Sequence, residues 1–193
     1  MSGLRESKKA ATRTALSRAA AQLAIMEGAE GVTVATIAAA AGVSRRTFHN
    51  YFASREEALI EFLNTTMQQL VSQLNELPEE LSAREAVETL VINHLYAGES
   101  ALNSFPTIIR VSEIVEMYGP PSKFIDSTMV FVPILEYFRK KMPGVPDFEL
   151  MVTIHLHGVA VATALKQYYD SPDPRDPATA ESLVRRATAM LKD

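Results

Sequence analysis

The polar side chains best suited to chemistry gather between residues 45 and 50, where the sequence reads Arg-Arg-Thr-Phe-His-Asn. At about 100° per residue in an α-helix, four of these side chains fall within an arc of about 140°. They are Arg45, Arg46, His49 and Asn50. Arginine donates to guanine or to phosphate, asparagine pairs with adenine, and histidine donates to base or phosphate. This face therefore predicts hydrogen-bond donation to a nucleic acid.

Two short helices around Gly42 would present this face to a DNA groove. Thr33 is the predicted cap of the first helix, which ends at Gly42, and Ser44 is the predicted cap of the second, which runs to about Tyr51. This is the arrangement of a helix-turn-helix, whose second helix enters the major groove. The alternative is a solvated face on a small three-helix unit, which two arginines alone would favour.

Further hydroxyl and cationic side chains surround this face and are candidates for contacts to the DNA backbone. They are Thr33, Ser44, Thr47, Tyr51 and Arg55, together with Lys8 and Lys9 on an expected basic N-terminal arm that also carries Arg5. Residues 1–55 have a net charge of +5, whereas the remaining residues have a net charge of −9. A basic N-terminal segment followed by an acidic remainder is typical of a polyanion-binding module joined to a domain with a second function. The alternative is a random fluctuation of surface charge.

Several classes of site find no support in the sequence. Among 193 residues, 47% are hydrophobic and none is cysteine, so the chain can bury a sizeable core but has no disulfide or thiol nucleophile. His155 and His157 lie on different faces of a helix and His94 is distant in sequence, which argues against a metal site. No catalytic triad, phosphate loop or carboxylate pair is recognisable, so we expect no enzyme and no cofactor. Without an apolar run of roughly 18 residues or a signal peptide, we expect a cytoplasmic protein with no membrane partner.

The spacing of apolar residues predicts an all-α fold, because no alternating stretch is long enough to indicate a sheet. The expected helices span residues 5–27, 33–41, 44–51, 54–77, a segment from 82 onward, 104–118, 122–142, 147–170 and 176–191. Ser54 with Glu57, and Ser82 with Glu85, have the spacing of a capping box. Pro133 is expected to kink the helix over residues 122–142.

Residues 33–59 resemble the N-terminal signature of the tetracycline-repressor (TetR) family. In order, they contain Thr-Val-x-x-Ile-Ala, Ala-Gly-Val-Ser, Thr-Phe, Tyr-Phe and Ser-Arg-Glu-Glu, a combination far more specific than a single short motif. The resemblance covers about residues 8–63. It implies a one-component transcriptional regulator in which the N-terminal domains of a homodimer bind a palindromic operator. The C-terminal helices would then hold an effector pocket and the dimer interface.

The resemblance also implies roles for individual residues. Base contacts would come from Arg45, Arg46 and Asn50. Phosphate contacts would come from Thr47, Tyr51 and Arg55, with Ser44 as the cap of the reading helix. Two positions depart from the family pattern, because His49 stands where Tyr is usual and Arg55 where Lys is commoner.

We expect a DNA-binding domain at residues 1–54 and a helical domain for effector binding and dimerisation at residues 55–193. The opening residues 4–9 also resemble a subgroup that includes mycofactocin-associated regulators, which respond to acyl-coenzyme A. We therefore expect a repressor that is released by a small hydrophobic or acyl-type effector. The alternative is a dimeric small-molecule-binding protein without sequence-specific DNA binding.

Beyond residue 63 only local chemistry guides the choice of residues. Aromatic and methionine side chains alternate with a few polar ones in a predicted effector pocket, although most such residues are ordinary core residues. These candidates are His94, Phe105, Ile109, Glu113, Met117, Tyr118, Phe124 and Met129. Small residues on the helix over 147–170 permit close approach of a second copy, with intramolecular packing as the alternative. The predicted interface residues are Phe131, Leu135, Leu156, Val159, Ala160 and Thr163.

Overall fold

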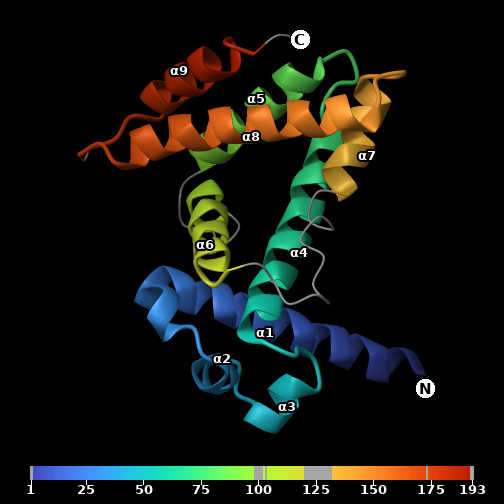
Figure 1. The fold of residues 1–193 in the computed structure, drawn as a ribbon, viewed down its shortest axis with the longest axis vertical. Coiled ribbons are helices and arrows are strands. Elements are labelled where there is room, and N and C mark those ends of the chain that lie inside the picture. Colours follow the sequence, from blue (N-terminus) through green and yellow to red (C-terminus); the bar gives the residue numbers. More distant parts are fainter. Residues whose placement is uncertain (1, 98–101, 103, 120–131, 173, 192–193) are drawn as a thin grey trace. The chain divides into compact units, whose positions relative to one another are not determined.

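The computed structural model describes residues 2–97, 102, 104–119, 132–172 and 174–191, which form α-helices joined by turns and loops (Figure 1). The helices are α1 (Ser2–Gly31), α2 (Val34–Ala40), α3 (Arg45–His49), α4 (Arg55–Glu76), α5 (Ala83–Ala97), α6 (Phe105–Met117), α7 (Val132–Lys141), α8 (Asp147–Tyr169) and α9 (Pro177–Thr188). The residues so described contain no strand, and the predicted all-α class is confirmed.

The chain divides into two compact units, each assembled from two stretches of sequence. The first unit contains Met1–Thr66 and Thr107–Val130, and the second contains Met67–Pro106 and Phe131–Asp193. Helices α4 and α6 therefore contribute residues to both units. The expected functional boundary after residue 54 falls within the first unit, and it stays a prediction.

Glycine and threonine end and begin the first helices as their chemistry predicts. Gly28 interrupts α1 with a φ of 69°, a left-handed conformation that residues with a Cβ rarely adopt. Thr33 caps α2: the Thr36 amide donates to Thr33 Oγ1 at 3.1 Å, and the Thr33 amide donates to Thr36 Oγ1 at 3.0 Å. Gly42 follows α2 with a φ of 68°. The predicted ends of these helices are confirmed.

One of the two predicted capping boxes is complete. At the start of α5, the Ser82 amide donates to the Glu85 carboxylate at 2.9 Å, and the Glu85 amide donates to Ser82 Oγ at 3.2 Å. At the start of α4, the Glu57 amide donates to Ser54 Oγ at 3.3 Å. The Glu57 carboxylate instead accepts from the Ala53 amide at 2.5 Å. Of the two hydrogen bonds expected in this capping box, the one to the Ser54 hydroxyl is present. The Glu57 carboxylate accepts from the amide of Ala53 and not from that of the cap, Ser54.

Prolines lie near the first described residues of two later helices. Pro133 follows Val132, the first described residue of α7, and residues 120–131 before it lie outside the described residues. The expected kink at Pro133 therefore stays a prediction. Asp176 caps α9, since the Ala178 amide donates to its carboxylate at 3.0 Å, and Pro177 is the first residue of that helix, as predicted.

Large apolar side chains form the core of the first unit around α3. Phe48 and Phe52 are buried, with ring centroids 5.7 Å apart. Leu16 from α1, Ile37 from α2 and Leu59 from α4 are fully buried as well. Each such side chain contributes about 1.5–3 kcal/mol on burial. The core therefore anchors α3 from its inner side.

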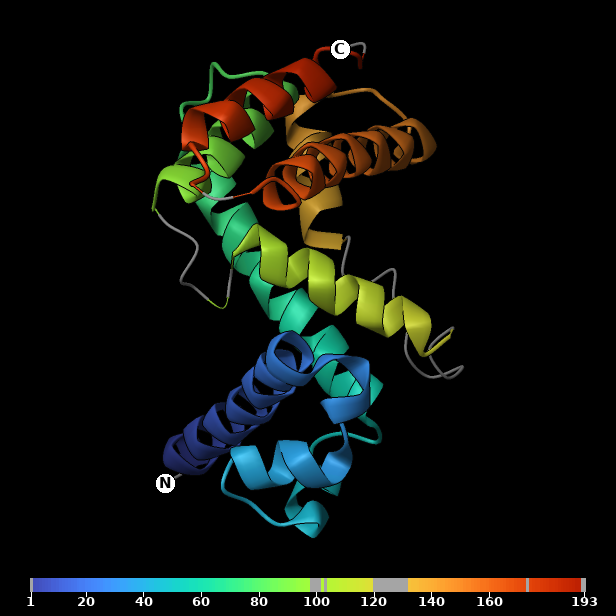
Figure 2. The same cartoon turned by 90° about the vertical axis from the view of Figure 1, so that its left-hand side faces the viewer.

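In the second unit, α8 packs against both α7 and α9, and α9 also packs against α5 (Figures 1 and 2). Fully buried side chains in this part are Val91, Phe138, Leu150, Leu165 and Val184, which come from all four helices. The buried apolar faces of these helices meet here.

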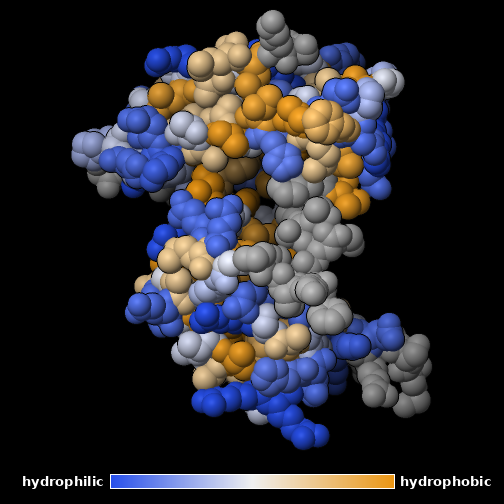
Figure 3. Space-filling model, viewed as in Figure 1, coloured by the Kyte–Doolittle hydropathy of each residue, from blue (hydrophilic) through white to orange (hydrophobic). Residues whose placement is uncertain are grey.

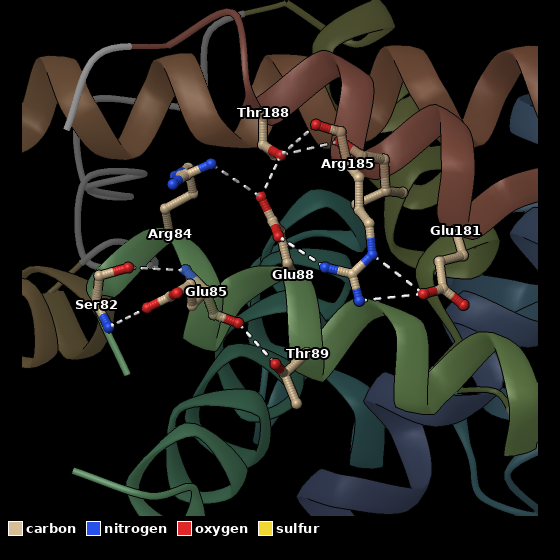
Figure 4. A network of polar contacts seen from close by, with 9 residues as sticks. Ser82, Arg84, Glu85, Glu88, Thr89, Glu181, Arg185 and Thr188 are labelled. Carbon is tan, nitrogen blue, oxygen red and sulfur yellow. Dashed lines mark hydrogen bonds and ion pairs between the residues drawn. The ribbon is translucent and has the colours of Figure 1, made fainter. Parts of the chain in front are cut away.

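A buried carboxylate joins α5 to α9 (Figure 4). Glu88 is 5% exposed and accepts from the Thr188 hydroxyl at 2.5 Å. Its oxygens also lie 3.4 Å from Arg185 and 3.8 Å from Arg84, and Arg185 is paired with Glu181 at 3.0 Å. A buried charge is costly unless it is paired and hydrogen-bonded. This cluster therefore has a structural role and holds α9 on α5.

Candidate nucleic-acid interface

Helix α3 turns its polar side chains to solvent because its apolar side is anchored in the core. Phe48 is 0% exposed. The residues Arg45, Arg46, His49 and Asn50 are all exposed. The helix is therefore divided into a buried face and a polar face as its sequence predicts. We call this polar face, made of those four residues, the reading face.

The two arginines of the reading face are available to a partner. Within the described part of the chain, neither Arg45 nor Arg46 forms a hydrogen bond or an ion pair. Arg46 and His49 stand in the last turn of α3, where the helix dipole favours positive charge. Planar guanidinium groups that are not used inside the protein suit bidentate recognition of guanine or phosphate.

The predicted phosphate ligands around the reading face include the helix caps. Ser44 Oγ accepts from the Thr47 amide at 3.0 Å and lies 2.8 Å from Thr47 Oγ1. Thr33 Oγ1 likewise accepts from the Thr36 amide at the start of α2. A hydroxyl that accepts from an amide keeps its own proton, but Thr47 Oγ1 lies beside Ser44 Oγ and Thr36 Oγ1 lies 3.0 Å from Thr33 Oγ1, so these neighbours compete with a phosphate for that proton.

Other cationic candidates lie on α1 and beside the reading face. Lys8 and Lys9 are exposed on the early turns of α1, so the expected basic N-terminal arm is helical at these residues. Tyr51 is half-buried directly after α3. The roles of these three residues as phosphate ligands stay predictions.

Arg55 is used within the first unit. Its Nη1 donates to the Val32 carbonyl at 2.9 Å, and its Nε lies 3.1 Å from the Glu56 carboxylate. The guanidinium carbon stands 3.9 Å from the centre of the Tyr118 ring. These contacts compete with the predicted contact to phosphate.

Arg13 is a functional candidate that sequence reasoning missed. From α1 it donates to the Tyr51 carbonyl at 2.8 Å and to Glu61 at 2.8 Å, and its guanidinium carbon lies 4.4 Å above the Phe52 ring. The hydrogen bond with Glu61 raises the pKa of Arg13 further above its usual value. By helical spacing, Arg13 falls on the same face of α1 as Leu16. A cation on the core-facing side of a helix indicates that its side chain has a partner inside the protein. This position could have shown that Arg13 binds the chain just after α3.

Two predicted effector residues come together in the second unit. The rings of His94 and Phe105 meet edge to face, with centroids 5.3 Å apart. His94 Nε2 lies 2.7 Å from the side-chain oxygen of Gln73, a partner that the sequence did not reveal. The predicted residues Phe124 and Met129 lie outside the described residues. Only this pair of the eight candidates is brought into direct ring contact in the part of the chain that the structure describes.

The candidates on α6 have other surroundings. Ile109 is half-buried, and Glu113 pairs with Arg110 at 3.2 Å. Met117, in the last turn of the helix, is 69% exposed. Tyr118 donates its hydroxyl proton to a backbone carbonyl near the end of α1. For these four residues, effector contact stays a prediction that their observed contacts do not support.

Acid is expected to destabilise the fold through His94. Burial lowers the pKa of His94 below its usual value. The unfolded chain then binds more protons than the folded chain, so the stabilisation is present above the unfolded pKa and is lost as pH falls through the folded pKa. Between about pH 7 and pH 5, we expect the melting temperature of the His94→Gln variant to fall less than that of the wild type. Thermal unfolding at a series of pH values checks this, and parallel curves would contradict it.

Among the described residues of the second unit, two buried polar atoms have no hydrogen-bond partner: Tyr137 Oη and His157 Nε2. His157 Nδ1 lies 2.8 Å from the Thr153 carbonyl and donates to it, which leaves Nε2 as an acceptor without a donor. An unpaired buried polar group costs about 1–3 kcal/mol, so such groups mark candidate ligand contacts. Sequence reasoning did not select either residue as an effector contact. The sequence feature that could have identified them is a polar side chain on an otherwise apolar helix face.

Helix α8 has two apolar faces. Leu150 and Leu165 are buried on the inner face. Four large side chains are exposed within an arc of about 80° on the opposite face. They are Phe148, Val152, Leu156 and Val159, which we call the outer stripe. Figure 3 shows apolar side chains gathered over α8.

The predicted interface residues lie partly on this outer stripe. Leu156 and Val159 belong to it, and Thr163 is exposed one turn further along the same face. Ala160 and Leu135 are half-buried at other positions. Phe131 lies outside the described residues.

Metal and membrane sites receive little support. The described residues contain no group of three or more His, Asp or Glu side chains that could hold a metal ion. By length and composition alone, α8 is apolar enough to cross a membrane, and its inner face packs on α7 and α9.

Comparisons with known proteins indicate one family. Residues 16–62 match the family model described as bacterial regulatory proteins, tetR family. The fatty acid degradation regulator FadR from Bacillus halodurans is similar in structure, with a TM-score of 0.60 and 16% identity, over 92% of this chain and 93% of that chain. A TetR-family transcriptional regulator from Mesorhizobium loti has a TM-score of 0.50 and 16% identity, over 94% of this chain and 95% of that chain. No curated protein sequence gave a match. At these identities, the solved structures show the shared fold.

Proposed function

We propose that this chain, whose residues 16–62 match the model of the tetR family of bacterial regulatory proteins, is a transcriptional regulator of that family and acts as a repressor. A homodimer binds a palindromic operator through α3 of each protomer. A small hydrophobic or acyl-type effector then releases the operator. The protein acts in the cytoplasm and catalyses no reaction.

The observation that carries this proposal is the reading face of α3. Arg45 and Arg46 are exposed cations without partners in the described chain, and the neighbouring Asn50 has a side chain that suits adenine. The buried Phe48 holds this face outward, and α2 stands before it across the turn at Gly42. This is the geometry by which a helix-turn-helix places donors against base edges.

The outer stripe of α8 supports dimerisation. A continuous row of exposed apolar residues marks a surface that a partner can cover. A second copy is the occupant that fits, because a two-fold axis brings the same stripe of both copies together. Two reading faces related by such an axis match the two half-sites of a palindrome.

Placing a charge on the outer stripe is expected to separate the dimer. Val159→Asp introduces a carboxylate that loses its hydration in the interface, so the dimer dissociation constant should rise at least about 10-fold. Sedimentation velocity over a concentration series measures the change. Met26→Asp is the matched control, because Met26 is 80% exposed on α1. If both variants stay dimeric at the same concentrations as the wild type, the interface lies elsewhere.

The effector proposal is supported by unpaired polar atoms in an apolar environment. Among the described residues, the buried atoms His157 Nε2 and Tyr137 Oη have no hydrogen-bond partner. An apolar ligand with one polar group would satisfy such atoms while its body stays among apolar side chains. The similar regulator from Bacillus halodurans is named for fatty acid degradation, which agrees with an acyl-type effector for this chain.

The proposal is tested by DNA binding over a salt series. The purified protein is titrated onto the intergenic DNA upstream of its own gene and onto a random duplex of equal length. Preferential binding that weakens steeply with salt is the expected result, because each neutralised phosphate releases counterions. Acyl compounds are then screened for release of the bound DNA. Weak binding that ignores sequence would favour a dimeric ligand-binding protein without operator recognition.

A further inference from the structure

Tyr118 and Arg55 meet on the backbone where α1 ends and α2 begins. The Tyr118 hydroxyl donates to the Ala29 carbonyl at 2.5 Å, and Arg55 Nη1 donates to the Val32 carbonyl at 2.9 Å. The guanidinium carbon of Arg55 lies 3.9 Å from the centre of the Tyr118 ring. Two side chains, 63 positions apart in the sequence, thus hold one short backbone segment from two directions.

The local backbone explains why this segment needs support. Gly28 breaks α1 with its positive φ, so residues 29–32 are not held by a continuous helix. Val32 directly precedes the Thr33 cap of α2, and Arg55 is the first residue of α4. Helix α3 lies between these two points in the chain. A tie from Arg55 to Val32 therefore joins the two ends of the segment that contains the reading face.

The chemistry of both side chains suits this tie. A planar guanidinium can stack on an aromatic ring and donate at its edge to a carbonyl, which a lysine ammonium does not reproduce. Burial raises the pKa of Tyr118 above its usual value, so its hydroxyl keeps the proton that it donates.

We propose that Arg55 and Tyr118 are positioning residues for DNA binding, which hold the helix-turn-helix in its reading geometry without touching DNA. This inference rests on the proposed function. It assigns a DNA-binding role to Tyr118, which lies outside residues 16–62 of the family match. It also replaces the phosphate contact expected of Arg55 with a contact inside the protein.

Conservative variants separate a tie from a phosphate contact. Arg55→Lys keeps the charge that a phosphate needs but loses the stacking. Tyr118→Leu removes the ring and the hydroxyl, and Tyr118→Phe removes the hydroxyl alone. Arg18→Lys and Tyr96→Leu serve as matched controls, because both residues are exposed and form no part of this tie. Each variant is titrated with the upstream DNA and the random duplex over the same salt series.

We expect Arg55→Lys and Tyr118→Leu each to weaken binding of the upstream DNA about 3- to 30-fold. The salt slope and the affinity for random duplex should stay as in the wild type. The double variant should lose no more than about the larger single loss, because both changes break one tie. Tyr118→Phe should lose less, since its ring remains under the guanidinium.

Two results would overturn the proposal. One is wild-type binding by Arg55→Lys or Tyr118→Leu. The other is an Arg55→Gln variant whose salt slope falls by about one, which would make Arg55 a phosphate ligand. If the wild type itself ignores the upstream sequence, the proposed function fails, and hydrogen exchange at the amides of α2 and α3 still tests the tie. Faster exchange in Tyr118→Leu than in Tyr96→Leu would support it, and equal exchange would refute it.

Discussion

Replacing Arg45 or Arg46 by alanine is expected to lower affinity for the operator by about 1–3 kcal/mol, a loss of about 5- to 150-fold, while random duplex is bound with a smaller loss. Both guanidinium groups are exposed and have no partner in the described chain, so their donors are free for base edges. A bidentate contact to guanine discriminates between bases, whereas a contact to phosphate does not. Competition titrations of both DNAs at one salt concentration measure this difference.

The control for this experiment is Arg18→Ala, which removes an equal charge from an exposed position on α1. It should change the affinity for both DNAs little and equally. An equal loss on both DNAs for Arg45→Ala or Arg46→Ala would identify that arginine as a phosphate ligand. Operator specificity would then have to come from His49, Asn50 or the other arginine.

The largest expected loss of stability comes from truncating Phe48. Its side chain is 0% exposed, and it packs against Phe52 on the inner side of α3. Phe48→Ala should lower the free energy of unfolding by about 3–5 kcal/mol, because apolar burial is lost and a cavity is left. The total stability of a domain is about 5–15 kcal/mol, so DNA binding should fail with the fold. Urea denaturation followed by circular dichroism measures the change.

Met26→Ala is the matched control, because the removed side chain is 80% exposed. Its unfolding midpoint should stay close to that of the wild type. A similarly small effect of Phe48→Ala would mean that α3 does not depend on this anchor. The outward orientation of the reading face would then lack its physical explanation.

The ends of the helices were predictable from sequence because their signals are local. Thr33, Ser82 and Asp176 cap helices through hydrogen bonds to amides two or three residues away. Gly28 and Gly42 adopt the positive φ that ends or follows a helix. Such features depend on the chemistry of a few neighbouring residues, so the all-α fold and most helix limits could be predicted.

The candidate site was predictable in part for the same reason. The 100° helical period alone separates the exposed Arg45 and Asn50 from the buried Phe48. The helical period does not indicate which arginine side chains form hydrogen bonds or ion pairs within the protein and which do not. Arg55 looked equally available in the sequence, yet it is bound to Val32 and stacked on Tyr118.

Helical period, capping residues and the order of motifs specify the fold class of this protein and the exposed polar face of α3, because each acts over a single turn or helix. The placement of Arg13 against the Tyr51 carbonyl, Tyr118 against Ala29, and Thr188 against Glu88 was decided by the tertiary structure. These pairs are 38, 89 and 100 residues apart, respectively. Contacts at such separations depend on how whole helices pack, and no local pattern of residues encodes them.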